Sequence, residues 1–444
     1  MIKPTSLRHR SAGLARHFAL ALALAAGGAV LTVPGLADPA MAQKKKDEPK
    51  GAAKPVFSKP FVDAYQPLDK ALKAPDVDVA AIKPQMLAMV PLANSADEKY
   101  ALGIMMFNAG ITGKDELLQL QGVDLILASE KAPQADAARF NVVGFQITAG
   151  RREFERARAY LQRGIDLGFS SPSASTDDLR LNYAELYFSE ERYAEGLAYL
   201  ADLIAANKAA GIEVPLKWYR RAVSVAYTNE IVPQVYEFAA GWVTDYPSPD
   251  SWRDAVNLTR NLNDFESQPL LDLLRLGRKI GTFKGKNDYI SYIESADARR
   301  LPGEVKAVIE EAYANGTIPR GSDSFVDDQY RLASERAGTE RADMAGLERD
   351  ANATNAQLRT VVAAGDVFLS NGDHAKAAGF YQKALGMAGV DRDHVLTRLG
   401  MALIGTGDIA GAREALAKVG GARLPVARLW AAYAAQQGAA AAGG

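Results

Sequence analysis

Apolar and small residues recur at spacings of three and four along most of the chain, which is the pattern of helices with one buried face. In residues 365–387 this pattern predicts one helix before the turn Asn371-Gly372-Asp373 and a second helix after it. Residues 400–420 repeat the same frame 35 residues later. Because the alternation typical of strands is nearly absent, the pattern predicts an all-α protein built from antiparallel helix hairpins.

Small residues mark the places where the two helices of a hairpin would cross. Gly365 in the first helix and Ala377 in the second allow the backbones to approach closely, and Tyr381 fills the space beyond them. In the second copy the corresponding residues are Gly400, Ala412 and Leu416. We expect about eight such hairpins between residues 95 and 420, after a helical lead-in from about residue 60.

This frame resembles that of the tetratricopeptide repeat (TPR) family, which has small residues at positions 8 and 20, a large apolar residue at position 24 and Ala at position 27. Gly365, Ala377, Tyr381 and Ala384 occupy these four places. Trp218 and Trp252 are 34 residues apart, which is the period of the family, and each stands where the frame has Trp at position 4. The resemblance implies a right-handed superhelical solenoid with a concave groove.

Composition divides the remaining chain into unequal segments. We expect residues 60–318 to form an N-terminal TPR-like solenoid, and residues 358–438 to form C-terminal TPR repeats with a capping helix around Trp430. Residues 319–357 between them are highly charged and poor in large apolar residues, so they form either a solvated helical connector or a hinge. Residues 439–444 are predicted to be a frayed tail.

The N-terminus has the features of an export signal. Residues 1–42 combine basic residues, an apolar stretch and the small residues Ala40-Met41-Ala42 before a cleavage site. A membrane anchor is the alternative, but the apolar stretch is short for a bilayer span and is broken by glycine and proline. We expect a periplasmic or secreted protein of a Gram-negative bacterium, with no membrane span after cleavage. Residues 43–59, rich in Lys, Pro and Ala, are predicted to be a disordered linker.

Composition also narrows the chemistry. The chain has no cysteine, so disulfides and thiolate metal sites are excluded. After removal of residues 1–42, 48 basic and 52 acidic residues remain, a balance that indicates neither a nucleic-acid binder nor an anionic-membrane binder. Of the four histidines only His374 and His394 stay in the mature chain, and no metal-binding or hydrolase motif accompanies them. We therefore expect no enzyme activity, no cofactor and no metal.

One enzymatic alternative stays open, because exported helical solenoids include soluble lytic transglycosylases. Their catalytic Glu is followed by Ser, as in Glu294-Ser295 of this chain, but their downstream motif is missing here.

The glycines of residues 405–411 imitate part of a dinucleotide-binding motif. A helix rather than a strand precedes them, so we expect these glycines to shape a turn.

The TPR resemblance also implies where a partner would bind, since the first helix of each hairpin lines the groove through frame positions 5, 9, 12 and 13. Counted from Trp252, these places are Arg253, Asn257, Arg260 and Asn261. Counted from Trp218, they include Tyr219 and Tyr227, with Arg220 beside them. Arg253 and Asn257 share a helical face, at a spacing similar to that of the Lys and Asn with which related repeats bind a peptide carboxylate. A solvated surface is the alternative for the polar residues, and a core position is the alternative for the two tyrosines.

These observations predict a non-catalytic scaffold or adaptor that binds a protein or peptide segment in its groove and serves envelope assembly or secretion. The alternative is a glycan-binding solenoid that serves polysaccharide export or peptidoglycan. A polar groove of Arg and Asn favours a peptide, whereas a row of exposed aromatic side chains favours a glycan.

Overall fold

The computed structural model describes residues 55–443. The predicted signal peptide, and all but the last few residues of the predicted linker, lie outside the described residues. Within residues 55–443 the chain forms the helices α1 to α20 and two short 3-10 helices, and it forms no strand. The prediction of an all-α protein is therefore confirmed. In the same residues, no helix is long and apolar enough to cross a membrane.

Packing divides the chain into two compact units, with the division between Leu200 and Ala201, inside α8 (Tyr193–Ala209). The sequence pattern does not mark this place, because the helical frame continues through it. The charged segment that the pattern singles out, residues 319–357, lies well inside the second unit.

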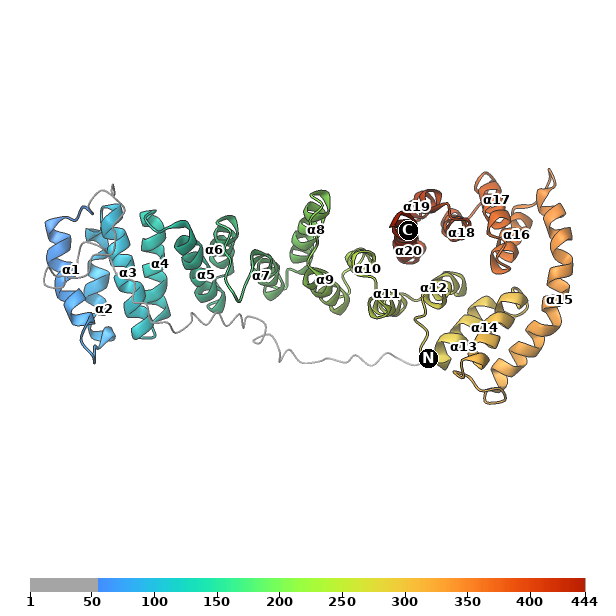
Figure 1. Cartoon of the computed structure of the whole chain (residues 1–444), viewed down its shortest axis with the longest axis horizontal. Helices are drawn as coiled ribbons and strands as arrows, with labels where there is room; N and C mark the ends of the chain where they lie inside the picture. Colours follow the sequence, from blue (N-terminus) through green and yellow to red (C-terminus); the bar gives the residue numbers. More distant parts are fainter. Residues whose placement is uncertain (1–54, 444) are drawn as a thin grey trace. The chain divides into compact units, whose positions relative to one another are not determined.

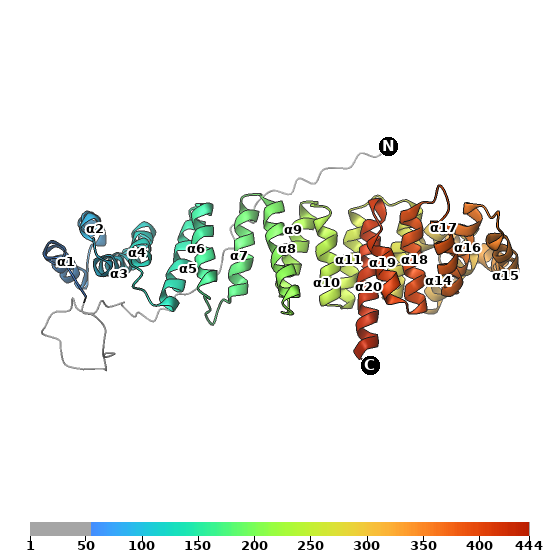
Figure 2. The ribbon, with the colours of Figure 1, turned by 90° about the horizontal axis from the view of Figure 1, so that it is seen from above.

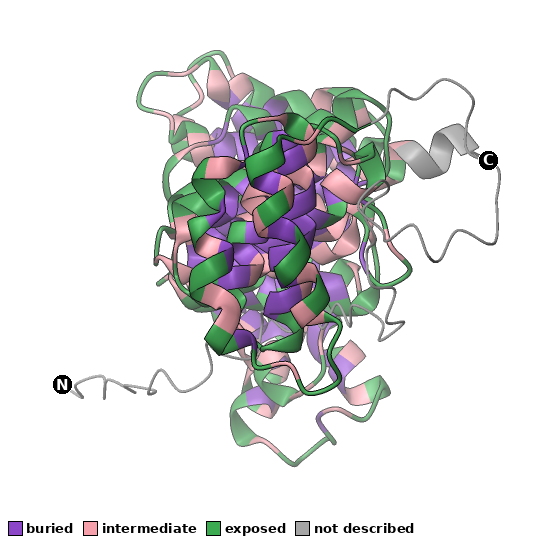
Figure 3. Cartoon of the chain, turned by 90° about the vertical axis from the view of Figure 1, so that its left-hand side faces the viewer, coloured by how far each residue is buried: buried purple, intermediate pink, exposed green. Residues whose placement is uncertain are grey.

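The first unit is a series of helices in which neighbours in sequence pack against each other. It contains α1 (Lys59–Leu72), α2 (Val79–Ala88), η3 (Val90–Leu92), α3 (Ala96–Thr112), α4 (Glu116–Ser129), α5 (Gln134–Gly150), α6 (Phe154–Asp166) and α7 (Thr176–Ser189). The most extensive contacts are between α3 and α4 and between α5 and α6. Their buried side chains form one apolar cluster over α1 to α4 and another over α3 to α7. Figure 3 shows buried positions on the inner faces of the helices and exposed positions on the outer faces.

The second unit continues with α9 (Leu216–Thr228), α10 (Gln234–Asp245), α11 (Pro249–Asn261), α12 (Ser267–Lys279), α13 (Lys286–Ala296), α14 (Pro302–Ala314) and α15 (Ser324–Asn352). It ends with α16 (Leu358–Ser370), α17 (His374–Leu385), α18 (Arg392–Thr406), α19 (Ile409–Ala417), η4 (Gly421–Arg423) and α20 (Leu424–Gly443). Consecutive helices again pack on each other, as in a helical solenoid.

The frame of small and large residues is a packing rule of these hairpins. A Cβ atom at Gly365 would lie 2.6 Å from the Tyr381 ring, so an alanine there would push α16 and α17 apart or displace the ring. Gly144 and Tyr160 make the same contact between α5 and α6 at 2.7 Å, and both pairs are 16 residues apart. Gly400 and Leu416 repeat the contact in α18 and α19.

Residues 319–357, for which the sequence left a helical connector or a hinge open, form one continuous helix, α15, over most of their length. Asp323 caps this helix by accepting a hydrogen bond from the Val326 amide at 3.1 Å. Val326, Ala333 and Ala351 are buried, and α15 packs on both α14 and α16. Most of its other residues are at least partly exposed, which accounts for the high charge of the segment.

The C-terminal helix α20 does more than cap the last repeat. Besides α18 and α19, it packs against α10, α11 and α12, which lie far earlier in the sequence. Figures 1 and 2 show α20 beside these helices. In an open solenoid each repeat contacts only its neighbours. The second unit therefore closes on itself, which the sequence pattern did not predict.

Candidate functional site

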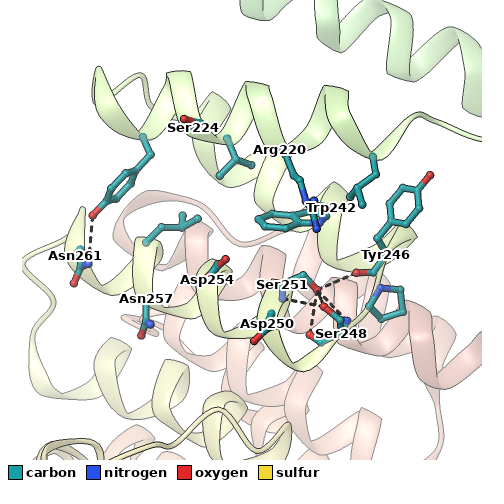
Figure 4. Close-up of a pocket in the computed structure, with 15 residues that line it drawn as sticks. Arg220, Ser224, Trp242, Tyr246, Ser248, Asp250, Ser251, Asp254, Asn257 and Asn261 are labelled. Carbon is teal, nitrogen blue, oxygen red and sulfur yellow. Dashed lines mark hydrogen bonds between the residues drawn. The ribbon is translucent and has the colours of Figure 1, made fainter. Parts of the chain in front are cut away.

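A groove of about 790 Å³ lies between α9 and α11, the first helices of two successive hairpins (Figure 4). The α9 wall consists of Leu216, Arg220, Val223, Ser224 and Tyr227, and the α11 wall consists of Asp250, Ser251, Asp254, Asn257, Leu258 and Asn261. The end of α10 and the following turn add Trp242, Tyr246, Pro247 and Ser248. Spacings of three and four place the lining residues of each helix on one face. We call this site the α9–α11 groove.

Local sequence fixes where the α11 wall begins. Ser248 and Ser251 form a capping box, in which the Ser248 hydroxyl accepts from the Ser251 amide at 3.0 Å and the Ser251 hydroxyl accepts from the Ser248 amide at 2.9 Å. Pro249 stands in the first turn, where its missing N–H leaves no hydrogen bond unmade. The Ser251 hydroxyl also donates to the Tyr246 carbonyl at 2.9 Å. These bonds set the direction in which α11 leaves α10.

The two walls face each other in a register of 34 residues. Asn261 donates from Nδ2 to the Tyr227 hydroxyl at 3.3 Å, and the numbers of these residues differ by 34. The same offset relates Arg220 of α9 to Asp254 of α11, and both line the groove. Trp218 and Trp252 of the sequence frame are also 34 residues apart. One repeat period therefore separates corresponding residues of the two walls.

Several polar side chains of the groove are exposed and take part in no hydrogen bond or ion pair within the part of the chain that the structure describes: Arg220, Ser224, Asp254 and Asn257. They offer a cation on the α9 wall and a carboxylate and an amide on the α11 wall. Exposed charged groups without an ion pair are available to a ligand that enters the groove.

Trp242 lies between the two walls and forms the floor of the groove (Figure 4). Val223 and Leu258 add apolar surface from the walls. Both aliphatic side chains are buried, whereas Trp242 is half-buried. The other three tryptophans of the chain are buried in the core, with exposed fractions of 0 %, 5 % and 3 %. Trp242 is therefore the one tryptophan whose indole a ligand in the groove would contact directly.

The structure brings together four of the seven residues that the sequence assigned to the groove, namely Arg220, Tyr227, Asn257 and Asn261. Tyr219 lies elsewhere: it is buried, and its hydroxyl donates to Asp245 Oδ2 at 2.5 Å. Burial and this bond raise the pKa of Tyr219 well above its usual value. Tyr219 is thus a core residue beneath the α9 wall.

Arg253 and Arg260 also lie outside the groove. Arg253 Nη2 is 2.7 Å from Asp250 Oδ1, and Arg260 donates from Nη2 to Ser291 of α13 at 2.8 Å. The reason is the rotation of α11, because Trp252, Ala255, Val256 and Thr259 fill its core face. Frame positions 5 and 12 then turn away from the groove, and positions 2, 6 and 10 turn into it. The predicted pair of Arg253 and Asn257 is not assembled in the groove.

Ser224, Asp254 and Trp242 are among the lining residues that the sequence pattern did not predict. Asp254 could have been found, because it follows Arg220 by one repeat period. Nothing in the frame indicates Trp242, since it comes from the second helix of a hairpin and the frame assigns the groove to first helices.

A second set of charged side chains is buried between α12 and the C-terminal helices. Asp272 is fully buried and lies 3.1 Å from Arg275, 3.1 Å from Arg398 and 2.6 Å from Arg423. Burial alone would raise the pKa of Asp272, but the three guanidinium groups outweigh it and hold the pKa below its usual value. Arg398 and Arg423 follow Asp272 by 126 and 151 positions, so no local pattern could reveal the contact.

Two further carboxylates complete this set. Glu304 Oε2 lies 2.6 Å from Arg275, and Asp366 Oδ1 lies 2.5 Å from Arg398. Burial would raise the pKa of both carboxyl groups, but the arginines lower it. We call these six residues the Asp272 cluster: Asp272, Arg275, Glu304, Asp366, Arg398 and Arg423. Its three positive and three negative charges balance, so the cluster joins α12 to α14, α16, α18 and η4 without requiring a ligand.

Comparison with known proteins adds no family to this description. No protein-family model matches the chain, and no curated protein matches it. Among residues 55–443, no group of three His, Asp or Glu side chains is placed to hold a metal ion. Structure alone therefore defines the class of this protein, which is an all-helical, solenoid-like protein with a polar groove between successive hairpins.

Proposed function

We propose that this protein is a non-catalytic, TPR-like scaffold or adaptor that binds an extended segment of another protein in the α9–α11 groove. The observation that carries this proposal is the set of unpaired polar groups, with Arg220 on one wall and Asp254 and Asn257 on the other. An extended backbone offers an N–H and a C=O at each residue, and these groups need partners when they are covered. The groove supplies both kinds of partner.

Each wall suits a different part of such a segment. The Arg220 guanidinium would donate to a peptide carbonyl or to a carboxylate, and Asp254 would accept from a peptide N–H. Asn257 offers both a donor and an acceptor. A large apolar side chain of the segment would rest on Trp242, because aromatic anchors of this kind supply much of the binding free energy at interfaces. The volume of about 790 Å³ is typical of sites that enclose a small ligand, so the groove suits a short segment rather than a folded domain.

The location of this function follows from the N-terminal sequence. A cleaved signal over residues 1–42 would deliver the scaffold to the periplasm or outside the cell, where segments of exported proteins are available before assembly. We therefore propose a role in envelope assembly or secretion.

Glycan binding is the second candidate, because Tyr227, Trp242 and Tyr246 all line the groove. Aromatic faces provide apolar platforms, and carboxylate and amide groups can bind hydroxyls. The Tyr246 hydroxyl is already engaged, however, since it donates to the Val214 carbonyl at 2.5 Å, and the Tyr227 hydroxyl already accepts from Asn261. The unpaired Arg220, Asp254 and Asn257 favour a peptide.

The transglycosylase alternative has no support from the groove. Glu294 is exposed on α13 and does not line the groove. A general acid of that kind needs an enclosed site that raises its pKa. The proposal is accordingly non-catalytic.

The experiment is a crosslinking pull-down from envelope extract, with residues 43–444 as bait, beside the double variant Arg220→Ala, Asp254→Ala. We expect the double variant to lose at least one protein that the unmodified bait captures, because both walls lose their charged partner. The matched control is Asp328→Ala, Arg331→Ala, which removes an exposed ion pair from α15 (67 % and 72 % exposed) and should capture the same proteins as the unmodified bait. Capture of the same set by all three baits would overturn the peptide assignment, and glycan binding would then be tested.

A further inference from the structure

The C-terminal helix α20 packs against two of the three helices that form the α9–α11 groove. It packs against α10, which supplies the floor, against α11, which supplies one wall, and against α12 (Figures 1 and 2). A site near the middle of the chain is therefore supported by the last helix of the chain.

Two polar contacts hold α20 to the two ends of α10. Arg428 Nη1 lies 2.9 Å from Glu237 Oε1 in the first turn of α10. Gln436 donates from Nε2 to the Val243 carbonyl in the last turn at 2.5 Å. Val243 directly follows Trp242, so the second contact holds the backbone beside the floor of the groove.

Contacts with α11 and α12 extend this support. The Tyr433 ring packs edge to face on Trp252 of α11, with 6.4 Å between the ring centroids. Trp252 lies on the core face of α11, whereas Asp254 on the same helix lines the groove. The Trp430 indole donates to the backbone carbonyl of Asp272 in α12 at 2.9 Å.

The Asp272 cluster fixes the start of α20. Arg423 directly precedes the helix, and its Nη1 lies 2.6 Å from Asp272 Oδ2 in a buried site. A buried ion pair tolerates little displacement, because separation leaves both charges without partners. The helix is thus attached at its start by charge and along its length by the contacts with α10 and α11.

We propose that α20 is a clasp for the groove: when docked, it holds α10 and α11 in the positions that form the site, and a ligand in the groove strengthens its docking. The first part rests only on the contacts above. The second part rests on the proposed function, because it requires a ligand that binds the docked state more tightly than the undocked state. Coupling of this kind is reciprocal, so weaker docking lowers ligand affinity.

The physical reason is that undocking removes partners from α10 and α11. The Val243 carbonyl loses its hydrogen-bond donor, the Glu237 carboxylate loses the guanidinium beside it, and Trp252 loses the ring that packs on it. The end of α10 is then less constrained, and the Trp242 indole no longer has one fixed position between the walls.

The test uses residues 43–444 labelled with fluorotryptophan, whose four fluorine resonances are assigned by Trp→Phe replacements. The variant Gln436→Ala removes the bond to Val243, and the neighbouring exposed Gln437→Ala is its control. We expect the Trp242 resonance to shift or broaden in Gln436→Ala. Gln436 bonds to the carbonyl of Val243 and not to Trp242 itself, so such a change would show that the bond positions the floor of the groove. Trp218 should stay unchanged, and Gln437→Ala should change none of the four resonances.

A second variant, Tyr433→Ala with Gln436→Ala, weakens the docking of α20 further. It is used in case the change of the Trp242 resonance in Gln436→Ala alone is too small to measure. Changes at Trp252 and Trp430 with an unchanged Trp242 in both variants would overturn the clasp, since α20 would then be a cap that does not affect the groove. Far-UV circular dichroism establishes that each variant keeps its helices.

The ligand part is tested with random peptides displayed on phage. We expect peptides selected on the unmodified protein to bind Gln436→Ala about five- to tenfold more weakly and Gln437→Ala equally well. Equal binding to all three proteins would overturn the coupling. If no displayed peptide binds the unmodified protein, the proposed function fails, while the fluorine spectra still decide whether α20 sets the groove.

Discussion

The Asp272 cluster and the α9–α11 groove both place arginine beside aspartate, yet they leave these groups in opposite states. Asp272 is fully buried and contacts three guanidinium groups. Arg220 and Asp254 stand on different walls of the groove, exposed and without an ion pair in the described chain. A buried charge must be paired inside the fold, whereas an exposed charge stays hydrated until a ligand arrives. The comparison separates the charged residues that hold the fold from those available for binding.

The strongest test of this difference removes a charge from the cluster. Arg398→Ala leaves the fully buried Asp272 and the partly buried Asp366 with fewer partners, so we expect the free energy of unfolding to fall by about 3–5 kcal/mol. Urea denaturation followed by circular dichroism measures the loss. Arg331→Ala, which removes an exposed guanidinium from α15, should change the same quantity by less than about 0.5 kcal/mol. Equal effects of the two substitutions would show that the cluster does not hold the fold.

Acid should weaken the Asp272 cluster, because its carboxylates stabilise the fold only while they are charged. The folded-state pKa of Asp366 is lowered from its usual 3.8, so its contribution to stability is fully present above about pH 5 and is lost as the pH falls through the folded-state value. In Asp366→Asn, the plot of unfolding free energy against pH below pH 4 should therefore be shallower by up to about 1.4 kcal/mol per pH unit. The exposed Asp328→Asn is the control, and an unchanged slope in Asp366→Asn would contradict the pairing.

Glycine substitutions show whether the repeats around the cluster are as tightly packed as the frame requires. Gly365→Ala places a Cβ 2.6 Å from the Tyr381 ring and should destabilise the protein by about 1–3 kcal/mol. Gly379 on α17 has no atom within 4 Å of such a Cβ, so Gly379→Ala should stabilise the helix by about 0.5–1 kcal/mol. Thermal unfolding of the two variants gives the sign of each change. A rise in stability for Gly365→Ala would refute the close crossing.

The smallest effect on stability is expected in the groove. Arg220→Ala with Asp254→Ala removes no internal partner, so the unfolding free energy should stay within about 0.5 kcal/mol of the unmodified protein. The same urea denaturation measures it. A loss of several kcal/mol would mean that these residues hold the fold, and the contrast with the Asp272 cluster would disappear.

The local pattern of apolar and small residues was sufficient to predict the helices and much of the packing within the hairpins. The contact of Gly365 with Tyr381 depends on residues 16 apart within one hairpin, and the register of Tyr227 with Asn261 depends on one repeat period. Both distances are visible in the sequence as recurrences. The same recurrence would have located Asp254 from Arg220.

Contacts between residues far apart in the sequence leave no such recurrence. The clasp joins Gln436 to Val243, 193 residues apart, and the cluster joins Arg423 to Asp272, 151 residues apart. Neither contact repeats along the chain, so no period reveals it. The rotation of α11 that turns Arg253 away depends on how Trp252 packs in the core, which the frame alone does not specify.

The central claim, that the α9–α11 groove holds a protein segment, is tested most directly by site-specific photocrosslinking. Benzoylphenylalanine is placed at Ser224 inside the groove, or at Arg331 on the exposed face of α15, and the protein is irradiated in envelope extract. We predict that position 224 forms an adduct with a defined protein segment, that position 331 does not, and that Arg220→Ala with Asp254→Ala abolishes the adduct. No protein adduct from position 224, or the same adducts from both positions, would contradict the account.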